Sequence, residues 1–206
     1  ITTTHKIELV VDSLFDVQVK RIHEYKRQLL NILHVVHLYD QLRKNPKMRV
    51  PKRTFLFGGK AAPGYYMAKQ IIRLINDVAE KVNRDVEIED RLRVLFVTNY
   101  GVSSSEKIIA ASEVSEHIST AGTEASGTSN MKFSLNGCIL LGTHDGATIE
   151  IGEEVGSENI FTFGLKANDV QQLKAIGYDP QQIYNDNPRV KNVLDLVGSG
   201  FFNPQE

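Results

Sequence analysis

Short apolar runs alternate along the chain with longer stretches in which apolar residues recur at helical spacing. The short runs predict strands at Leu14–Val19, Thr54–Phe57, Arg93–Val97, His117–Ser119, Ile139–Leu141 and Asn159–Phe163. The longer stretches predict helices at Glu24–Lys44, Met67–Val82 and Ser103–Ile109, followed by two or three short helices between Asp169 and Val197. Strand and helix therefore alternate through the first half of the sequence.

This alternation is typical of an α/β fold with a parallel sheet and helices on both faces. We expect a single Rossmann-like domain over residues 1–206, a length that fits one domain. Ligands of such folds bind beyond the carboxyl ends of the strands. Polar or glycine-rich segments follow three predicted strands at Lys20–Arg21, Gly58–Lys60 and Asn99–Tyr100. The sequence thus predicts a binding site at this edge of the sheet.

Composition and charge narrow the class of protein. Hydrophobic residues make up 41% of the chain, charged residues 24%, and the net charge is −1, which is ordinary for a globular protein and favours no nucleic-acid partner. Apolar stretches fall short of the roughly 20 residues that span a bilayer. The segment Ile1–Glu8 lacks the basic and apolar regions of a signal peptide, and the first residue is not Met, so we expect a cut from a longer polypeptide. The single cysteine, Cys138, predicts a buried thiol and a reducing compartment such as the cytoplasm.

The segment Glu124–Phe133 carries the strongest chemical signal. Its small residues allow backbone N–H groups to approach an anion, and Ser126, Thr128 and Ser129 add hydroxyl donors. Lys132, the one cation of the segment, could act as a charge clamp or as an amine nucleophile toward an aldehyde. A Ser/Gly turn in front of a helix is the alternative.

A second signal is the cluster of four cations between Lys20 and Arg27 at a strand-to-helix junction. Such a cluster suits one or two phosphates, especially beside the positive end of a helix. The alternative is a solvated basic face.

Three further segments are weaker. Phe57–Gly64 is glycine-rich but has neither dinucleotide nor P-loop spacing, and we expect no catalysis by Lys60. In Val97–Ser103 a tyrosine could flank an aromatic cofactor or belong to the core. In Gly142–Glu150 the spacing of His144, Asp145 and Glu150 matches no compact metal site, so we expect no metal.

Two of these segments, Glu124–Phe133 and Val19–Gln28, closely resemble motifs of the α-glucan phosphorylases, the glycogen, starch and maltodextrin phosphorylase family. The resemblance extends from about Leu14 to Phe202. It implies that the chain is the central part of the carboxyl-terminal half of a glycosyltransferase fold with two Rossmann-like domains, the other domain and the last helices lying outside it. It also implies a homodimer, in the cytoplasm or in a plastid.

The resemblance further implies that pyridoxal 5'-phosphate is held as a Schiff base on Lys132. It implies these other roles: Lys20, Thr128 and Ser129 contact the cofactor phosphate; Asn99 and Tyr100 line the cofactor pocket; Arg21 and Lys26 hold the substrate phosphate; Tyr25, Glu124, Ser126 and Gly127 contact the sugar. Gly101 departs from the arginine of the animal enzymes, which leaves any contact of that arginine in doubt.

The implied reaction is reversible phosphorolysis of a terminal α-1,4-linked glucosyl unit of an α-glucan by orthophosphate, which yields glucose 1-phosphate. We expect the 206-residue chain alone to be inactive, because one wall of the site would be missing. Two other functions are open: a nucleotide-sugar glycosyltransferase, which would bind a nucleoside diphosphate tightly, and a binding module that kept the fold but not the catalysis.

Overall fold

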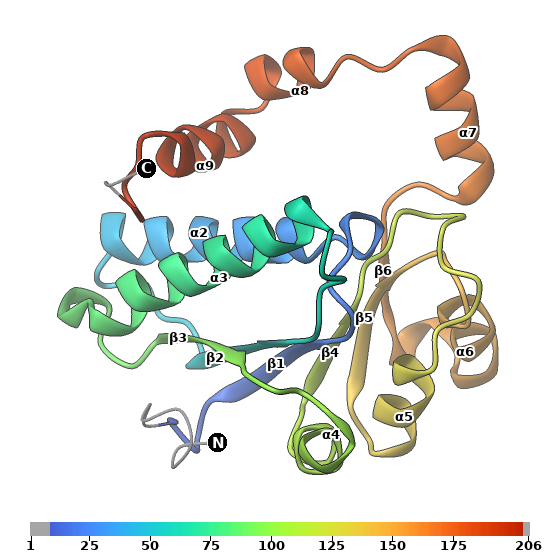
Figure 1. Ribbon diagram of the computed structural model, residues 1–206, viewed down its shortest axis with the longest axis horizontal. Coiled ribbons are helices and arrows are strands. Elements are labelled where there is room, and N and C mark those ends of the chain that lie inside the picture. Colours follow the sequence, from blue (N-terminus) through green and yellow to red (C-terminus); the bar gives the residue numbers. More distant parts are fainter. Residues whose placement is uncertain (1–8, 204–206) are drawn as a thin grey trace.

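One parallel sheet organises the computed structural model, which describes residues 9–203 (Figure 1). Its six strands lie in the order β3-β2-β1-β4-β5-β6, and every neighbouring pair is parallel. The strands are β1 Leu14–Val19, β2 Arg53–Gly58, β3 Leu92–Val97, β4 Val114–His117, β5 Ile139–Thr143 and β6 Phe161–Phe163. The predicted Rossmann-like α/β class is confirmed.

Helices cover both faces of this sheet (Figure 1). The α-helices are α2 Gln28–Lys44, α3 Tyr66–Arg84, α4 Val102–Ala110, α5 Ser129–Leu135, α6 Thr148–Val155, α7 Ala167–Ile176, α8 Pro180–Asp186 and α9 Pro188–Gly198. Single 3₁₀ turns are η1 Glu24–Lys26, η2 Val86–Ile88 and η3 Ser157–Asn159. Helices α2 and α3 lie on one face, and α4, α5 and α6 lie on the other.

Side chains that alternate along the strands supply two separate cores. Phe55 and Phe57 of β2 point into a cluster with α2 and α3, whereas Leu56 points into a cluster with β1, β3, α4 and α5. This period of two is what a strand imposes when both of its faces are covered. The two cores hold the strand ends, and therefore the segments that follow them, in fixed positions.

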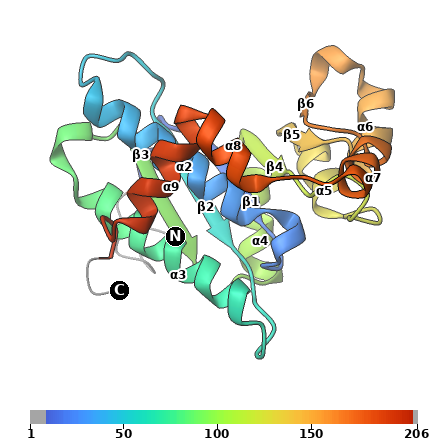
Figure 2. The same ribbon diagram turned by 90° about the horizontal axis from the view of Figure 1, so that it is seen from above.

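The last three helices return across the molecule. After β6 the chain runs through α7 and α8 to α9, which lies outside α2 and α3 (Figure 2). Val193 of α9 is buried in the same cluster as Tyr39 of α2, and Phe201 and Phe202 pack against that cluster. Within residues 9–203, no helix combines the length and the apolar character needed to cross a membrane.

Several predicted boundaries were wrong. Strand β4 spans Val114–His117, whereas the prediction placed it at His117–Ser119, and the last strand starts at Phe161 and not at Asn159. The helix predicted from Glu24 is split, because Arg27 adopts a left-handed conformation with φ of 59° between η1 and α2. Helix α6 was not predicted at all. The segment Ile1–Glu8, for which no signal peptide was predicted, lies outside the described residues.

Candidate active site

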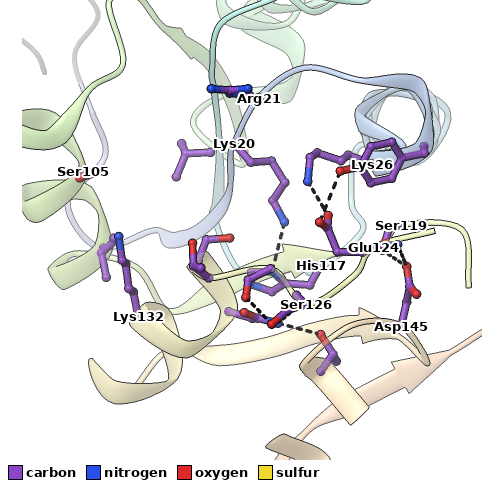
Figure 3. Close-up of a pocket in the computed structure, with 18 of the residues that line it drawn as sticks. Lys20, Arg21, Lys26, Ser105, His117, Ser119, Glu124, Ser126, Lys132 and Asp145 are labelled. Atoms are coloured by element: carbon purple, nitrogen blue, oxygen red, sulfur yellow. Dashed lines mark hydrogen bonds and ion pairs between the residues drawn. The ribbon is translucent and has the colours of Figure 1, made fainter. Parts of the chain in front are cut away.

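A cavity of about 410 Å³ opens at the carboxyl ends of β1 and β4. The order of strands reverses at this point, since the chain moves outward from β1 to β3 and then returns to β4 on the other side of β1. Open α/β sheets bind ligands at such a reversal. Three segments form most of the cavity (Figure 3): the β1 turn, residues 20–27; the β4 loop, residues 118–128; and the start of α5.

The side chain of Lys20 reaches from the β1 turn to the end of β4. Its ammonium group donates a hydrogen bond of 2.7 Å to the carbonyl oxygen of Glu116, and its Nζ lies 3.1 Å from Nδ1 of His117. Burial and the nearby charge of Lys26 lower the pKa of Lys20 to about 7. An anion in the cavity would offset both effects, so Lys20 is suited to bind one.

His117 ends β4 with its ring buried beneath the cavity. Its Nε2 lies 2.9 Å from Oγ of Ser115, on the opposite side of the ring from Lys20. Burial, followed by the charges of Lys20 and Lys26, lowers the pKa of His117 well below its usual value. The imidazole is therefore neutral near pH 7 and serves as a polar support for Lys20.

Lys26 and Glu124 form an ion pair between the β1 turn and the β4 loop. Tyr25 extends this contact, since its hydroxyl donates to Oε1 of Glu124 over 3.4 Å. Burial alone would lower the pKa of Lys26, but the hydrogen bond to Glu124 raises it above the ordinary value. Lys26 thus stays charged beside the cavity.

The β1 turn has a tightly specified backbone. Gly59 adopts a φ of 155°, and a Cβ built there would lie only 1.8 Å from the carbonyl oxygen of Lys20. The backbone N–H of Thr120 donates to the carbonyl of Tyr25 over 3.0 Å, which ties the turn to the β4 loop. The glycine-rich segment at the end of β2 thus packs against the Lys20 backbone, and Lys60 lies exposed on it.

The β4 loop presents small polar residues to the cavity. Ser126, Gly127, Thr128 and Ser129 all line it. Asn130, which is buried, donates to the carbonyl of Ser126 at 3.5 Å and lies 3.4 Å from Oγ1 of Thr148. Ser126 and Thr128 are exposed, so the loop faces solvent on its outer side.

Lys132 lies at the rim of the cavity on α5, near Ser105 and apart from Lys20 (Figure 3). Its side chain is exposed, and so is that of Arg21 across the cavity. Tyr100 also lines the cavity, and burial raises the pKa of its hydroxyl. Asn99 is exposed with a φ of 52° and is not among the lining residues.

Most of the residues singled out in the sequence therefore meet at one cavity: Lys20, Arg21, Tyr25, Lys26, Tyr100, Glu124, Ser126, Gly127, Thr128, Ser129 and Lys132. Sequence reasoning missed Ser105, His117, Ser119 and the place of Asp145, all of which also line it. Ligands of such sheets bind at the carboxyl ends of the strands, so a correct prediction that β4 ends at His117 would have identified this residue. Within residues 9–203, no three His, Cys, Asp or Glu side chains converge as a metal site would require.

Comparison with known proteins gives one family. The family described as "Carbohydrate phosphorylase" matches residues 1–206. The chain is 59% identical over 199 residues to glycogen phosphorylase of Synechocystis sp., covering 96% of this chain and 23% of that protein. It is 54% identical over 202 residues to the muscle form of glycogen phosphorylase of Ovis aries, covering 98% and 24% respectively. The chain thus spans about a quarter of the length of these curated relatives.

Proposed function

Because the chain belongs to the carbohydrate phosphorylase family, we propose that it contributes one wall of the active site of an α-glucan phosphorylase. The reaction is reversible phosphorolysis: orthophosphate cleaves a terminal α-1,4-linked glucosyl unit to release glucose 1-phosphate. The observation that carries the proposal is the meeting of Lys20, Arg21 and Lys26 with Glu124 at one cavity. Three cations beside a carboxylate suit an anionic substrate that must also contact a neutral sugar.

The residues present fit pyridoxal 5'-phosphate, which the family implies. The cavity lies within the range of about 300–1,000 Å³ usual for small-molecule sites. Lys20 brings a partly desolvated ammonium group, Thr128 and Ser129 bring hydroxyl and backbone donors, and Tyr100 brings an aromatic ring. Lys132 would hold the cofactor through its ε-amine.

When bound, this cofactor supplies a phosphate monoester whose second pKa of about 6 allows proton exchange near neutrality. Arg21 and Lys26 would bind the substrate phosphate and offset the repulsion between two phosphates in one cavity. Lys26 must then exchange part of its contact with Glu124 for the incoming anion. Tyr25, Glu124, Ser126 and Gly127 would orient the sugar. Asn99, which does not line the cavity, is not part of this proposal.

The site of this chain is one-sided. Arg21, Ser126, Thr128 and Lys132, which are proposed to touch substrate or cofactor, are exposed to solvent. Exclusion of water strengthens electrostatic contacts in an active site, so a second wall is required for catalysis. We therefore expect the 206-residue chain alone to be inactive and the full-length protein, as a homodimer, to be active.

The test is an assay of the full-length protein for release of glucose 1-phosphate from maltoheptaose and orthophosphate. Lys132→Ala should abolish turnover, whereas Lys60→Ala, which removes an exposed lysine outside the cavity, should leave it intact. Reduction with borohydride and peptide mapping should place a pyridoxyl mass on the peptide that holds Lys132.

Three results would contradict the proposal. Label on Lys60 or Lys20 would overturn the role of Lys132. Tight binding of a nucleoside diphosphate without phosphorolysis would indicate a nucleotide-sugar glycosyltransferase. Turnover by the 206-residue chain within tenfold of an ordinary enzyme's value of about 10 s⁻¹ would show that the second wall is dispensable.

A further inference from the structure

Asp145 lies in the turn that follows β5, and its carboxylate is buried beneath the β4 loop (Figure 3). Oδ2 accepts hydrogen bonds of 2.6 Å from Oγ of Ser119 and 2.9 Å from the backbone N–H of Glu124. Oδ1 accepts a bond of 2.8 Å from the backbone N–H of Gly122. One side chain thus binds three points along six residues of the loop.

We propose that Asp145 is a positioning residue that holds Glu124 at the substrate side of the cavity. This inference rests on the proposed function, in which Glu124 orients the sugar and pairs with Lys26 beside the phosphate. The position of Glu124 matters for catalysis only if it has that role. Asp145 would act through the backbone of the loop and would not itself touch the substrate.

The three contacts match the acceptor oxygens of a carboxylate. An ionised Asp offers only acceptors, and all three partners are donors. The amide of an Asn residue has one acceptor oxygen and one NH₂ group, so whichever way it turns, the NH₂ group faces a backbone N–H. Hydrogen bonds to a charged group are also stronger than those between neutral groups. Asp145 is therefore matched to this loop in both charge and hydrogen bonding.

The remainder of the turn after β5 fixes the same loop further along. The backbone N–H of Ala147 donates to the carbonyl of Ser126 over 2.7 Å. Gly146, with φ of 54°, approaches that carbonyl so closely that a Cβ there would lie 2.4 Å from the oxygen. Oγ1 of Thr143 donates to the carbonyl of Ser119 over 2.6 Å. Residues 143–147 thus hold the start, the middle and the end of the segment that carries Glu124.

The β1 turn reinforces this arrangement from the opposite side. Nε of Arg27 donates to the carbonyl of Ile118 over 2.6 Å, and the charge of Asp145 interacts favourably with the Arg27 guanidinium. The Glu124 carboxylate, placed by its own backbone N–H on Asp145, then meets Lys26. Displacement of the loop would move Glu124 away from the sugar and would also separate it from Lys26, which is proposed to bind the substrate phosphate.

The test uses the full-length protein and a double-mutant cycle. Asp145→Asn and Glu124→Gln should each lower kcat/KM for maltoheptaose roughly tenfold or more. If Asp145 acts through Glu124, adding Asp145→Asn to Glu124→Gln should cost less than about threefold. Cofactor content and absorbance should be unchanged in all variants. Glu150→Gln, which neutralises an exposed carboxylate in the first turn of α6, is the matched control and should have no effect.

Hydrogen exchange gives a readout independent of activity. The amides of Gly122 and Glu124 should lose protection in Asp145→Asn, while those of β4 and β5 keep it. If Asp145→Asn does not fold, Ser119→Ala takes its place in the cycle, since it removes one of the three bonds. The exchange measurement then uses Asp145→Ala, which removes the bonds to both amides. Additive effects in the cycle, or unchanged protection of the two amides, would overturn the inference. Absence of phosphorolysis in the parent protein would overturn the proposed function, while the exchange result would still decide the role of Asp145.

Discussion

The ammonium nitrogen of Lys20 lies 3.1 Å from Nδ1 of His117, while the other ring nitrogen lies 2.9 Å from Oγ of Ser115. A protonated lysine has only donors, so Nδ1 is the acceptor and Nε2 carries the proton toward Ser115. The ring is thus held in one tautomer by a hydroxyl on one side and a cation on the other. The neutral ring and the carbonyl oxygen of Glu116 together position the ammonium group in the cavity.

This arrangement predicts how pH affects stability. The pKa of Lys20 falls from 10.5 to about 7 on folding because of burial. Between pH 7 and pH 10.5, Lys20 is protonated in the unfolded chain but not in the folded chain, so the free energy of unfolding rises with pH. Below about pH 7, Lys20 is charged in both states, and the full cost of burying that charge lowers the stability. Relative to Lys20→Met, the urea midpoint of the anion-free protein should therefore rise between about pH 7 and pH 10. Parallel pH profiles of the two proteins would contradict this, and saturating phosphate should flatten the difference.

A second pH effect concerns a buried pair of acids below the cavity. Asp16 is 1% exposed, and its Oδ1 is among the buried side-chain atoms that have no hydrogen-bond partner among the described residues. Burial raises the pKa of Asp16 from 3.8 to about 6 and raises that of Glu116 well above its usual value. Between about pH 4 and pH 6, Asp16 is protonated in the folded chain but ionised in the unfolded chain, so stability falls as pH rises through this range. Asp16→Asn should thus gain stability relative to the parent, on the order of 3 kcal/mol, between about pH 4 and pH 7. Urea unfolding at both pH values measures it; an unchanged difference would show that Asp16 titrates normally.

Phosphate binding should depend on Arg21, which is exposed on the cavity side of the β1 turn. Charge-assisted hydrogen bonds are each worth roughly 1.5–3 kcal/mol. In the full-length protein, Arg21→Ala should raise the KM for phosphate and lower kcat, with cofactor content unchanged. An effect below about threefold, or one matched by Lys60→Ala, would exclude the role.

The close approach of Gly59 to Lys20 predicts a backbone effect on the same site. Gly59→Ala would place a methyl group 1.8 Å from the Lys20 carbonyl, so the turn must move. In the full-length protein, the affinity of Gly59→Ala for phosphate, measured by isothermal titration calorimetry, should be about tenfold or more below that of the parent. Gly64→Ala is the control, because a Cβ there meets nothing within 4 Å. Equal affinities of the two variants would show that the turn adapts without cost.

The sequence predicted the fold better than the details of the site, for a physical reason. Apolar runs such as Thr54–Phe57 specify a buried strand locally, and the strands they predict are present. The interruption of the helix at Arg27 was missed because the left-handed residue there is not a glycine. Its side chain instead donates to the carbonyls of Ile118 and Ser119, which lie far along the chain.

The same contrast holds within the site. Lys20, Lys26 and Lys132 stand in continuous motifs, so they could be found without knowing any neighbour in space. Asp145 bonds a hydroxyl 26 residues earlier, and His117 meets a lysine 97 residues earlier. The pairing of β5 with β4 brings Asp145 and Ser119 together, and the pairing of β1 with β4 brings Lys20 and His117 together.

That pairing has a consequence for synthesis on the ribosome. Strands β1 and β4 join through Asp16–Val114 and Val17–Ser115, so the first half of the pocket is translated long before the second. The basic turn emerges without its acidic counterpart, and the residues that hold the Glu124 loop emerge later still. Parallel pairings of this range form slowly, and incomplete chains expose their strand edges meanwhile. The cavity therefore cannot be assembled until residues 118–148, which supply its second half, have left the ribosome.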